Sequence, residues 1–427
     1  MAQRQTSWFR ILILALSGGA IYLLPYLRFG FWDTMISELH LTNTQLGTIG
    51  AYYGISAIPS YFLGGVLADK LKAKKLLAFS LISTGLLGFY FGILPGYKAL
   101  LFIHACWGIT TTLTFWAAFQ KLTRLSAPPE KQAKIFGIIT ASRSFLYVIL
   151  SSLALWLASF FVSQATGLSA AIFFISAMHI IFGSAVLIFW NEEKESEAQS
   201  KENIFSFNDL KAVLRIPEVW ILSITMFAVY YMSRIAEVIT PYCSSPVALA
   251  VPVVLAGIIG NAKEYGVAPF AGFLAAAFAD RMGRIRFSII SIVVAMTSVA
   301  ILLVIPTSAT ILSVVLLLTY TLFCWCAYML VFAILDDADV PDEYSGIAIG
   351  TVSAIGFISE SAGSYTVGRV LDAFEGLAGF HMIFKIMIGS GLVTIVCYIV
   401  CAYFIKAKKS KKADVAQAIT DCSAEPA

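Results

Sequence analysis

The chain has 427 residues, of which 59% are hydrophobic and only 13% are charged, and its formal net charge is +4. Its mean hydropathy of +0.84 is far above that of a soluble domain, in which a polar surface offsets the apolar core. The composition therefore excludes a water-soluble globular protein and indicates one that crosses a membrane several times.

Twelve apolar stretches are each long enough to cross about 30 Å of hydrocarbon as a helix. Their approximate cores are residues 11–32, 43–67, 74–94, 98–120, 133–161, 168–190, 218–242, 251–279, 286–305, 309–335, 345–371 and 380–405. The first stretch follows a basic start, but it contains Arg28 and Asp33 and no convincing small-residue cleavage site. We therefore interpret it as a retained span and not as a signal peptide.

A hydrophilic segment that begins at Asn191 separates the first six stretches from the last six. We therefore predict an all-α membrane protein with twelve transmembrane helices in two six-helix bundles. The predicted parts are an N-terminal bundle at 1–190, a cytoplasmic linker at 191–217, a C-terminal bundle at 218–406 and a cytoplasmic tail at 407–427.

Lysine and arginine fall unevenly on the two sides that these spans define. With both termini in the cytoplasm, 22 of the 29 basic residues lie on the inner side, and the outer loops hold only Lys98. Because positively charged loops stay in the cytoplasm, this asymmetry predicts cytoplasmic termini. The net positive charge thus reflects topology and does not indicate a nucleic-acid partner.

The corner after the second span, "GGVLADKLKAKKLL" (64–77), has a counterpart after the eighth, "AAFADRMGRIRF" (276–287). Basic anchors alone would explain the cations but not the repeated Asp, which can bind a neighbouring helix N-terminus in one conformation and release it in another. Both corners resemble the cytoplasmic signature of the major facilitator superfamily. The matching residues are Gly65, Leu67, Asp69, Lys70 and Lys74 in the first copy and Asp280, Arg281, Gly283 and Arg284 in the second.

Two arginines lie at corresponding positions in the two halves. Arg28 stands 41 residues before Asp69, and Arg234 stands 46 residues before Asp280. A charge at membrane depth costs at least about 2.5–3.5 kcal/mol, so it usually faces a pathway or a partner. We predict that Arg28 and Arg234 face each other across a central site and clamp an oxyanion, because guanidinium offers forked donors. Snorkelling to the outer surface is the alternative for either arginine alone.

Further polar residues lie in spans that border the same site. Arg143 and Lys263 are near the middles of the fifth and eighth spans, and we expect them to assist the clamp. Tyr26 and Tyr230 shortly precede Arg28 and Arg234 and are assigned to the same site.

Three acids, Glu237, Glu264 and Glu360, stand against these four bases. The surplus positive charge predicts that an anion completes the site. Glu360 and Glu264 are the candidates for a coupling proton, because a low-dielectric site favours a protonated carboxyl group. Structural pairing with a base is the alternative for all three acids and is favoured for Glu237.

Aromatic side chains supply a weaker signal. Trp116 and Gln120 in the fourth span, and Trp325 and Tyr328 in the tenth, are of the kind that contacts a sugar-like substrate, although packing is the commoner role of aromatics in spans. The four histidines and seven cysteines show no metal-site spacing, so we expect no metal and no cofactor.

Within the superfamily, the first span and "YYMSR" in the seventh resemble the organophosphate:phosphate antiporter family, as does "NAKEYGVAPFAG" in the eighth. This resemblance implies that Arg28 and Arg234 bind phosphate. That family's histidine in the fifth span has no equivalent here. Over nearly the whole chain, "SGGAIYLLPYLRFGF", "LTNTQLG" and "GTVSAIGF" resemble the bacterial inner-membrane transporters of the YqcE/YihN group, which implies the fold and a transport role without a substrate.

We therefore expect a secondary active transporter of a small organic anion, such as a sugar phosphate or sugar sulfonate, that works by alternating access through symport or antiport. It is expected in the bacterial inner membrane as a monomer in contact with lipid, with no nucleic-acid partner and no enzymatic activity. Two alternatives remain open: a proton-coupled transporter of neutral sugars or drugs, and a transporter-like sensor of sugar phosphates.

Overall fold

The computed structural model describes residues 8–128, 131–190, 211–337 and 345–423, and the regular structure in these ranges is helical. The first six spans are built from α1 (Trp8–Ala20), α2 (Arg28–Glu38), α3 (Asn43–Lys70), α4 (Ala73–Gly92), α5 (Tyr97–Ile109), η1 (Thr110–Trp116), α6 (Ala117–Leu125), α7 (Gln132–Ala158) and α8 (Gln164–Phe189). The last six are built from α10 (Pro217–Ile235), η3 (Ala236–Val238), α11 (Ile239–Ser244), α12 (Val253–Asn261), η4 (Ala262–Gly266), α13 (Ala268–Met282), α14 (Arg284–Leu302), α15 (Thr310–Asp337), α16 (Ser345–Gly356), α17 (Ile358–Ala373) and α18 (Leu377–Ser423).

The predicted all-α fold with twelve spans is confirmed. Nine helical stretches in the described ranges are each long and apolar enough to cross a membrane. The other three spans are α1 with α2, the long helix α3, and α12 through α13.

Five of the twelve spans are interrupted by irregular turns. In the first span, residues 21–27 form tight turns in which the Leu23 and Leu27 amides donate to carbonyls three residues earlier, at 2.9 and 3.2 Å. Pro25 lies in this segment and has no N–H group, so one α-helical hydrogen bond cannot form there. A π-helical turn interrupts the fourth and eighth spans, a 3₁₀ turn interrupts the seventh, and the eleventh breaks at Phe357.

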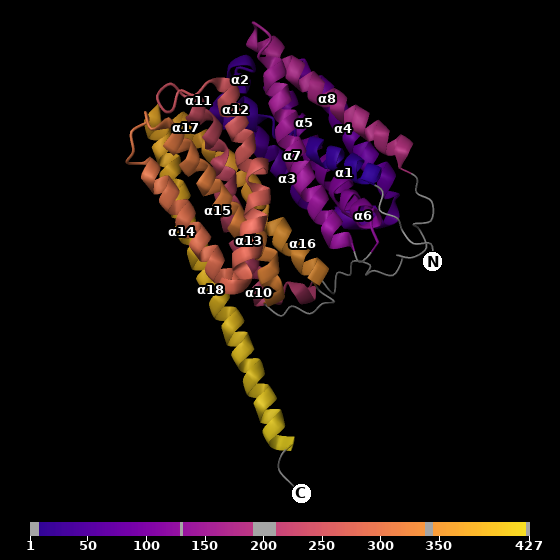
Figure 1. Cartoon of the computed structure of the whole chain (residues 1–427), viewed down its shortest axis with the longest axis vertical. Coiled ribbons are helices and arrows are strands. Elements are labelled where there is room, and N and C mark those ends of the chain that lie inside the picture. The colour runs from indigo at the N-terminus through magenta and orange to yellow at the C-terminus, as the bar shows by residue number, and fades with distance from the viewer. Residues whose placement is uncertain (1–7, 129–130, 191–210, 338–344, 424–427) are drawn as a thin grey trace.

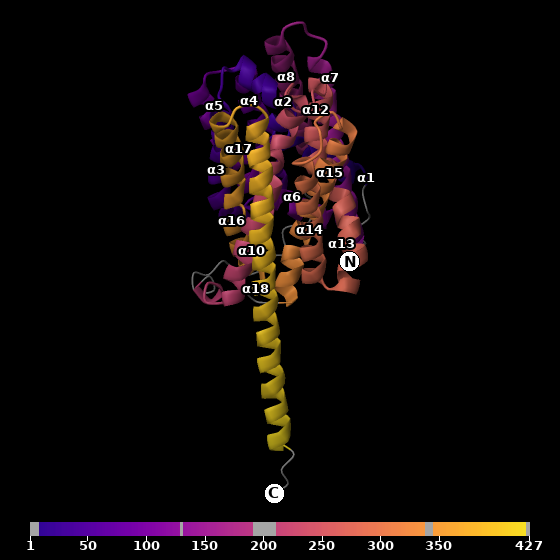
Figure 2. The same cartoon turned by 90° about the vertical axis from the view of Figure 1, so that its left-hand side faces the viewer.

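The first six spans, coloured indigo to magenta, lie beside the last six, coloured orange to yellow, with both termini toward one end (Figure 1). The two sets meet along α3 and α17, and where α12 packs against α2 and α7. Helix α18 continues without a break through most of the predicted tail and projects past the other helices (Figures 1 and 2).

Several hydrogen bonds join the first six and the last six spans at the end opposite the projecting part of α18, where α2, α11 and α12 lie (Figure 1). The Thr240 hydroxyl donates to the carbonyl of Phe29, and the Ser244 hydroxyl donates to the Asp33 carboxylate. With cytoplasmic termini, as the positive charges predict, this arrangement is closed on the outer side of the membrane.

Asp372 forms the most extensive of these outer contacts. One carboxylate oxygen accepts from the Asn43 backbone amide and side-chain amide, each at 3.0 Å, and the other accepts from the Thr44 amide at 2.7 Å. These groups are at the first turn of α3, whose free amides and positive dipole end attract a carboxylate. We call Asp372 with Asn43 and Thr44 the α3–α17 latch, because it ties a helix of the last six spans to one of the first six.

The two signature corners lie at the opposite end. The side chains of Gly65 and Asp69 are outside the described part of the chain, and Lys70 is exposed. In the second corner, Asp280 and Arg281 are exposed, and Arg284 donates to the Ala333 carbonyl of α15. Gly283 has φ +86° between α13 and α14, a conformation that favours glycine, so this position of the signature follows from the turn itself.

Replacement of Asp372 by alanine should weaken the α3–α17 latch. The lost charge-assisted hydrogen bonds are worth about 1–2 kcal/mol at this exposed position, so the outer end should open roughly five- to thirty-fold more often. The measurement is the rate at which a membrane-impermeant thiol reagent labels Ala154→Cys, a position that is 0% exposed here. The exposed acid Glu375, changed to alanine, is the matched control. Equal labelling of the Asp372→Ala and control proteins would show that the contact is not a latch.

Candidate functional site

Six charged residues meet where the spans are broken. Arg28 is the first residue of α2, Arg234 and Glu237 flank the junction of α10 and η3, Lys263 and Glu264 lie in η4, and Glu360 lies in the first turn of α17. All six are between 0% and 4% exposed. We call these six residues the charge cluster. Irregular turns free the backbone from the regular helical ladder, and such turns are typical of binding sites in transporters.

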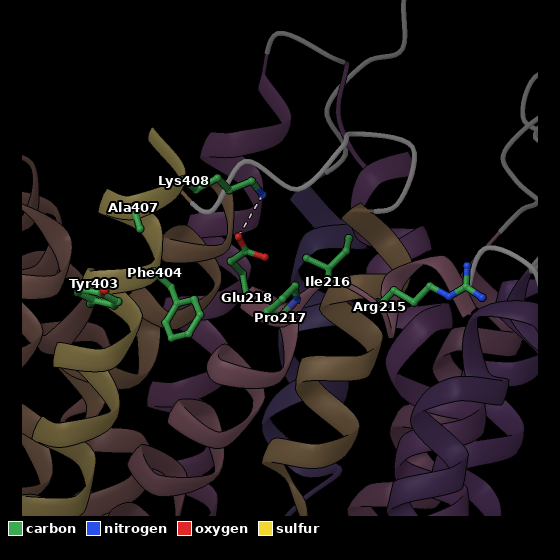
Figure 3. Close-up of a pocket in the computed structure, with 8 residues that line it drawn as sticks. All are labelled: Arg215, Ile216, Pro217, Glu218, Tyr403, Phe404, Ala407 and Lys408. Carbon is green, nitrogen blue, oxygen red and sulfur yellow. Dashed lines mark ion pairs between the residues drawn. The ribbon is translucent and has the colours of Figure 1, made fainter. Parts of the chain in front are cut away.

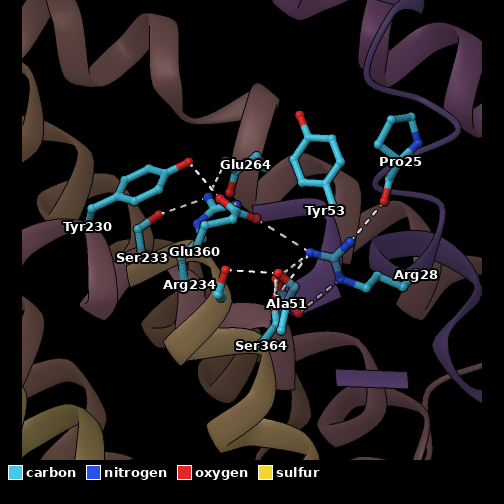
Figure 4. Close-up of polar contacts among 12 residues, drawn as sticks. Pro25, Arg28, Ala51, Tyr53, Tyr230, Ser233, Arg234, Glu264, Glu360 and Ser364 are labelled. Carbon is cyan, nitrogen blue, oxygen red and sulfur yellow. Dashed lines mark hydrogen bonds and ion pairs between the residues drawn. The ribbon is translucent and has the colours of Figure 1, made fainter. Parts of the chain in front are cut away.

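Arg28 uses its whole guanidinium group within this cluster. Its Nη2 and Nε atoms donate to the two carboxylate oxygens of Glu237, at 2.9 and 3.2 Å, and its Nη1 donates to the Pro25 carbonyl at 2.8 Å (Figure 4). Ser364 donates to Glu237 at 2.8 Å and accepts from Arg28 at 3.3 Å. The turn at 21–27 therefore supplies a backbone acceptor, and the last six spans supply the carboxylate.

Arg234 pairs with Glu264, and the Lys263 amine lies 3.7 Å from the same carboxylate. The Nε and Nη1 atoms of Arg234 and the Nζ atom of Lys263 are buried and have no hydrogen-bond partner among the described residues. This side of the cluster thus keeps donors that a further acceptor can use.

Glu360 lies between the two arginines. One of its oxygens is 3.5 Å from Arg28 Nη2, and the other is 3.5 Å from Arg234 Nη1. The Tyr230 hydroxyl donates to Glu360 at 2.9 Å (Figure 4). A carboxylate from the eleventh span therefore occupies the position between two arginines that the sequence assigns to an anion.

Aromatic rings cover the three cations. The Tyr26 ring is 5.2 Å from Arg28 Cζ and 6.0 Å from Arg234 Cζ, and the Phe29 ring is 4.1 Å from Lys263 Nζ. The Tyr230 ring is 4.7 Å from Arg234 Cζ. The negative faces of these rings stabilise cations that are out of reach of water.

A glycine allows the halves to approach each other beside the cluster. A Cβ atom added at Gly50 would lie 3.0 Å from Arg28 Cζ and 3.0 Å from the Ser364 side chain. A larger residue at position 50 of α3 would therefore displace α17 or the Arg28 side chain. This requirement explains a small residue at Gly50 without reference to backbone flexibility.

The structure brings together most of the residues that the sequence assigns to the site. Arg28, Arg234, Lys263, Tyr26, Tyr230, Glu264 and Glu360 are neighbours in the cluster. Arg143 lies apart, with its Cζ atom 5.2 Å from the ring of Trp116. Sequence reasoning missed Phe29 and Ser364. A signal for Ser364 existed, because it follows Glu360 by four residues and so shares its helix face.

The charges of the cluster balance. Three cations face three carboxylates. Glu237, whose pairing the sequence favoured as structural, lies closer to Arg28 than Glu360 does, at 2.9 Å against 3.5 Å. Arg143 forms no ion pair with a described carboxylate and is the surplus cation. The predicted excess of one positive charge therefore resides on Arg143, outside the cluster.

A groove of about 460 Å³ lies elsewhere, between the segment before α10 and the end of the twelfth span. Its charged pair, Glu218 and Lys408, is joined at 3.3 Å, and Tyr403 and Phe404 form its apolar wall (Figure 3). The end of the linker, the start of α10 and α18 line this groove, and none of its lining residues comes from the first six spans. It is therefore not part of a route between the two halves.

Residues 11–364 match the Major Facilitator Superfamily, and the chain belongs to that family. It is 26% identical over 387 residues to Inner membrane protein YihN of Escherichia coli (strain K12), covering 89% of this chain and 91% of that protein. It is 27% identical over 361 residues to Inner membrane protein YqcE of the same organism, covering 83% and 84%. The predicted membership of the major facilitator superfamily and the predicted resemblance to the YqcE/YihN group are thereby confirmed.

Solved transporter structures share the fold. The nucleoside transporter NupG superimposes with a TM-score of 0.73 at 16% identity, over 92% of this chain and 98% of that one. A bacterial homologue of the human lysosomal transporter Spinster superimposes with a TM-score of 0.70 at 14% identity, over 93% and 95%. At these identities the likenesses show the shared fold and nothing of the role or the substrate.

Replacement of Glu237 by alanine should strongly destabilise the protein, because it leaves Arg28 without its closest carboxylate in a buried site. Breaking a buried ion pair in this way costs about 3–5 kcal/mol. The measurement is the thermal midpoint of the detergent-purified protein. The double replacement Arg28→Met with Glu237→Met removes both charges and should recover most of the loss. A Glu237→Ala protein as stable as the unaltered protein would contradict the assigned pairing.

Proposed function

We propose that this superfamily member is a secondary transporter that moves a small organic anion across the bacterial inner membrane by alternating access. One observation carries the proposal: Arg28 and Arg234, from the first span of each half, lie within 3.5 Å of opposite oxygens of the same carboxylate, Glu360. The two guanidinium groups lie on either side of one carboxylate, and such an arrangement has the shape and charge to bind a tetrahedral or planar oxyanion.

Glu360 stands where the head group of the anion would bind. A phosphate, sulfonate or carboxylate at this position would accept from the same arginines and from the Arg234 donors that have no hydrogen-bond partner among the described residues. Glu360 and the substrate therefore compete for one position. When Glu360 leaves or becomes neutral, the arginines lose a counter-charge, and an incoming anion replaces it.

Glu360 is also the best candidate for the coupling proton. Glu237 makes two hydrogen bonds to Arg28 and one to Ser364, and Glu264 is shared by Arg234 and Lys263. The ion pairs of Glu360 are both 3.5 Å long, and its close contact is with the neutral Tyr230 hydroxyl. Protonation of Glu360 thus costs less ion pairing than protonation of Glu237 or Glu264.

Arg28→Lys and Arg234→Lys should abolish or greatly reduce anion flux in proteoliposomes. Lysine keeps the charge and supports folding, but it lacks the fork, and a lost bidentate contact costs about 1.5–3 kcal/mol, or roughly ten- to hundredfold in affinity. The substrates are found first by thermal stabilisation with sugar phosphates, sugar sulfonates, sugar carboxylates and neutral sugars. Arg286→Lys, at an exposed arginine outside the site, is the control. Stabilisation of all proteins by neutral sugars alone would reject an anion transporter.

Glu360→Gln should separate anion movement from the proton gradient. The amide resembles the protonated carboxyl group, so exchange of labelled for unlabelled anion should persist, while uptake driven by an acidic exterior should fall to the level without a gradient. Fluxes at several external pH values provide the measurement, and Glu375→Gln is the control. If gradient-driven uptake were unchanged in Glu360→Gln, a residue other than Glu360 would carry the coupling proton.

A further inference from the structure

Arg143 carries donors that nothing in the described part of the chain accepts. Its side chain is half-buried in α7, yet its Nε and Nη1 atoms are fully buried and have no hydrogen-bond partner among the described residues. Arg234 also has two donors without hydrogen bonds, but Glu264 and Glu360 balance its charge. Arg143 has no such carboxylate. A guanidinium group in this position lacks a counter-charge and is poised to bind an anion.

The surroundings of Arg143 belong to the space between the halves and not to the lipid surface. A Cβ atom added at Gly18 of the first span would lie 3.3 Å from Arg143 Cβ, and Tyr147, one turn further along α7, stacks on Tyr265 of the eighth span with ring centres 3.8 Å apart. Arg143 also acts electrostatically on Tyr22 of the first span and Tyr328 of the tenth. It is eleven residues from the start of α7 and fifteen from its end, or about 16 and 22 Å along the helix axis. A lipid head group at either membrane surface is therefore an unsuitable partner.

Two pairs of tyrosines connect Arg143 to the charge cluster. Tyr22 contacts Tyr26, which covers both arginines, with ring centres 5.8 Å apart. Tyr328 contacts Tyr230, the partner of Glu360, with ring centres 5.4 Å apart. One pair comes from each half, so a series of ring contacts leads from the neighbourhood of Arg143 to the arginine clamp in both halves.

The same region offers surfaces for an uncharged part of a ligand. The Trp116 ring lies beside Arg143, and Trp325 contacts Tyr328 with ring centres 4.9 Å apart. The Trp325 Nε1 atom is buried with no hydrogen-bond partner among the described residues. Indole faces bind the C–H faces of sugars and polyols, and an unpaired N–H requires an acceptor such as a hydroxyl oxygen.

We propose that Arg143 is a separate anion-binding subsite, which holds the head group of a hydroxylated organic anion while Glu360 occupies the clamp. The carboxylate, phosphate or sulfonate head binds Arg143, and the sugar or polyol body lies against Trp116, Tyr328 and Trp325. This inference rests on the proposed function. It adds that the transported anion occupies two positions in succession. The anion binds Arg143 first and moves to Arg28 and Arg234 when Glu360 gives up its place.

Quenching of tryptophan fluorescence by glucose 6-phosphate, gluconate and uncharged glucose tests this subsite in the purified full-length protein. In the unaltered protein, at least one of the two anions should quench, and glucose should not. Arg143→Gln should weaken anion binding roughly ten- to hundredfold, Arg143→Lys should weaken it less, and Trp116→Phe should reduce the signal. Arg28→Lys weakens the clamp and loses flux, but it should keep the quenching that an anion held at Arg143 produces. Thermal midpoints identify any variant that is misfolded, and the conservative Arg143→Lys and Trp116→Phe then carry the test.

The outcomes separate the subsite from the proposed function. If Arg143→Gln and Arg143→Lys bind the anions as tightly as the unaltered protein, and anion flux still depends on Arg28, the separate subsite is wrong and the transporter stands. If Arg28→Lys abolishes binding as completely as Arg143→Gln, one site holds the anion and the two-position sequence is wrong. If neither anion binds or moves in the unaltered protein while glucose does, both the function and the subsite fail.

Discussion

A cation buried at membrane depth needs a counter-charge inside the protein, and the centre of this molecule is arranged around that requirement. Arg28, from the first six spans, finds its carboxylates on Glu237 and Glu360 of the last six. The two halves therefore share one ionic unit and cannot separate at this depth without a replacement for the lost partner. The breaks in the spans, the close approach at Gly50 and the aromatic rings around the cations all serve to assemble this unit.

The cluster and the α3–α17 latch hold the same interface in different environments. The latch is exposed, so its hydrogen bonds compete with water and contribute little each. The cluster is buried, where an unpaired charge is costly. This difference gives an anionic ligand a direct influence on conformation, because the buried ionic contact between the halves is one in which a carboxylate already takes part. Arg143 has no carboxylate partner in the described ranges, so it is a second cation nearby that an anion can neutralise.

The sequence was sufficient for the twelve spans and for most of the residues at the centre, because hydropathy fixes which segments cross the membrane and charges are conspicuous within them. It did not predict which acid pairs with which base. Glu237 and Arg28 are 209 residues apart, and the packing of α2 against α11 and α12 brings their spans together. The helix breaks were also missed, since a π turn at Ala262–Gly266 leaves no strong mark in an apolar segment. Pro25 was the one clear indication.

The interruptions of the first, seventh, eighth and eleventh spans occur at the level of the charge cluster. A regular helix resists bending because every turn is tied to the next by hydrogen bonds, whereas these turns have already departed from that pattern. Each broken span thus acts as two rods joined at a pivot. In the first, seventh and eighth spans the outer rods α2, α11 and α12 are shorter than the inner rods α1, α10 and α13, whereas in the eleventh the outer rod α17 is the longer. Tilting of three short rods would therefore open the outer entrance with a lighter moving part than a whole six-helix bundle.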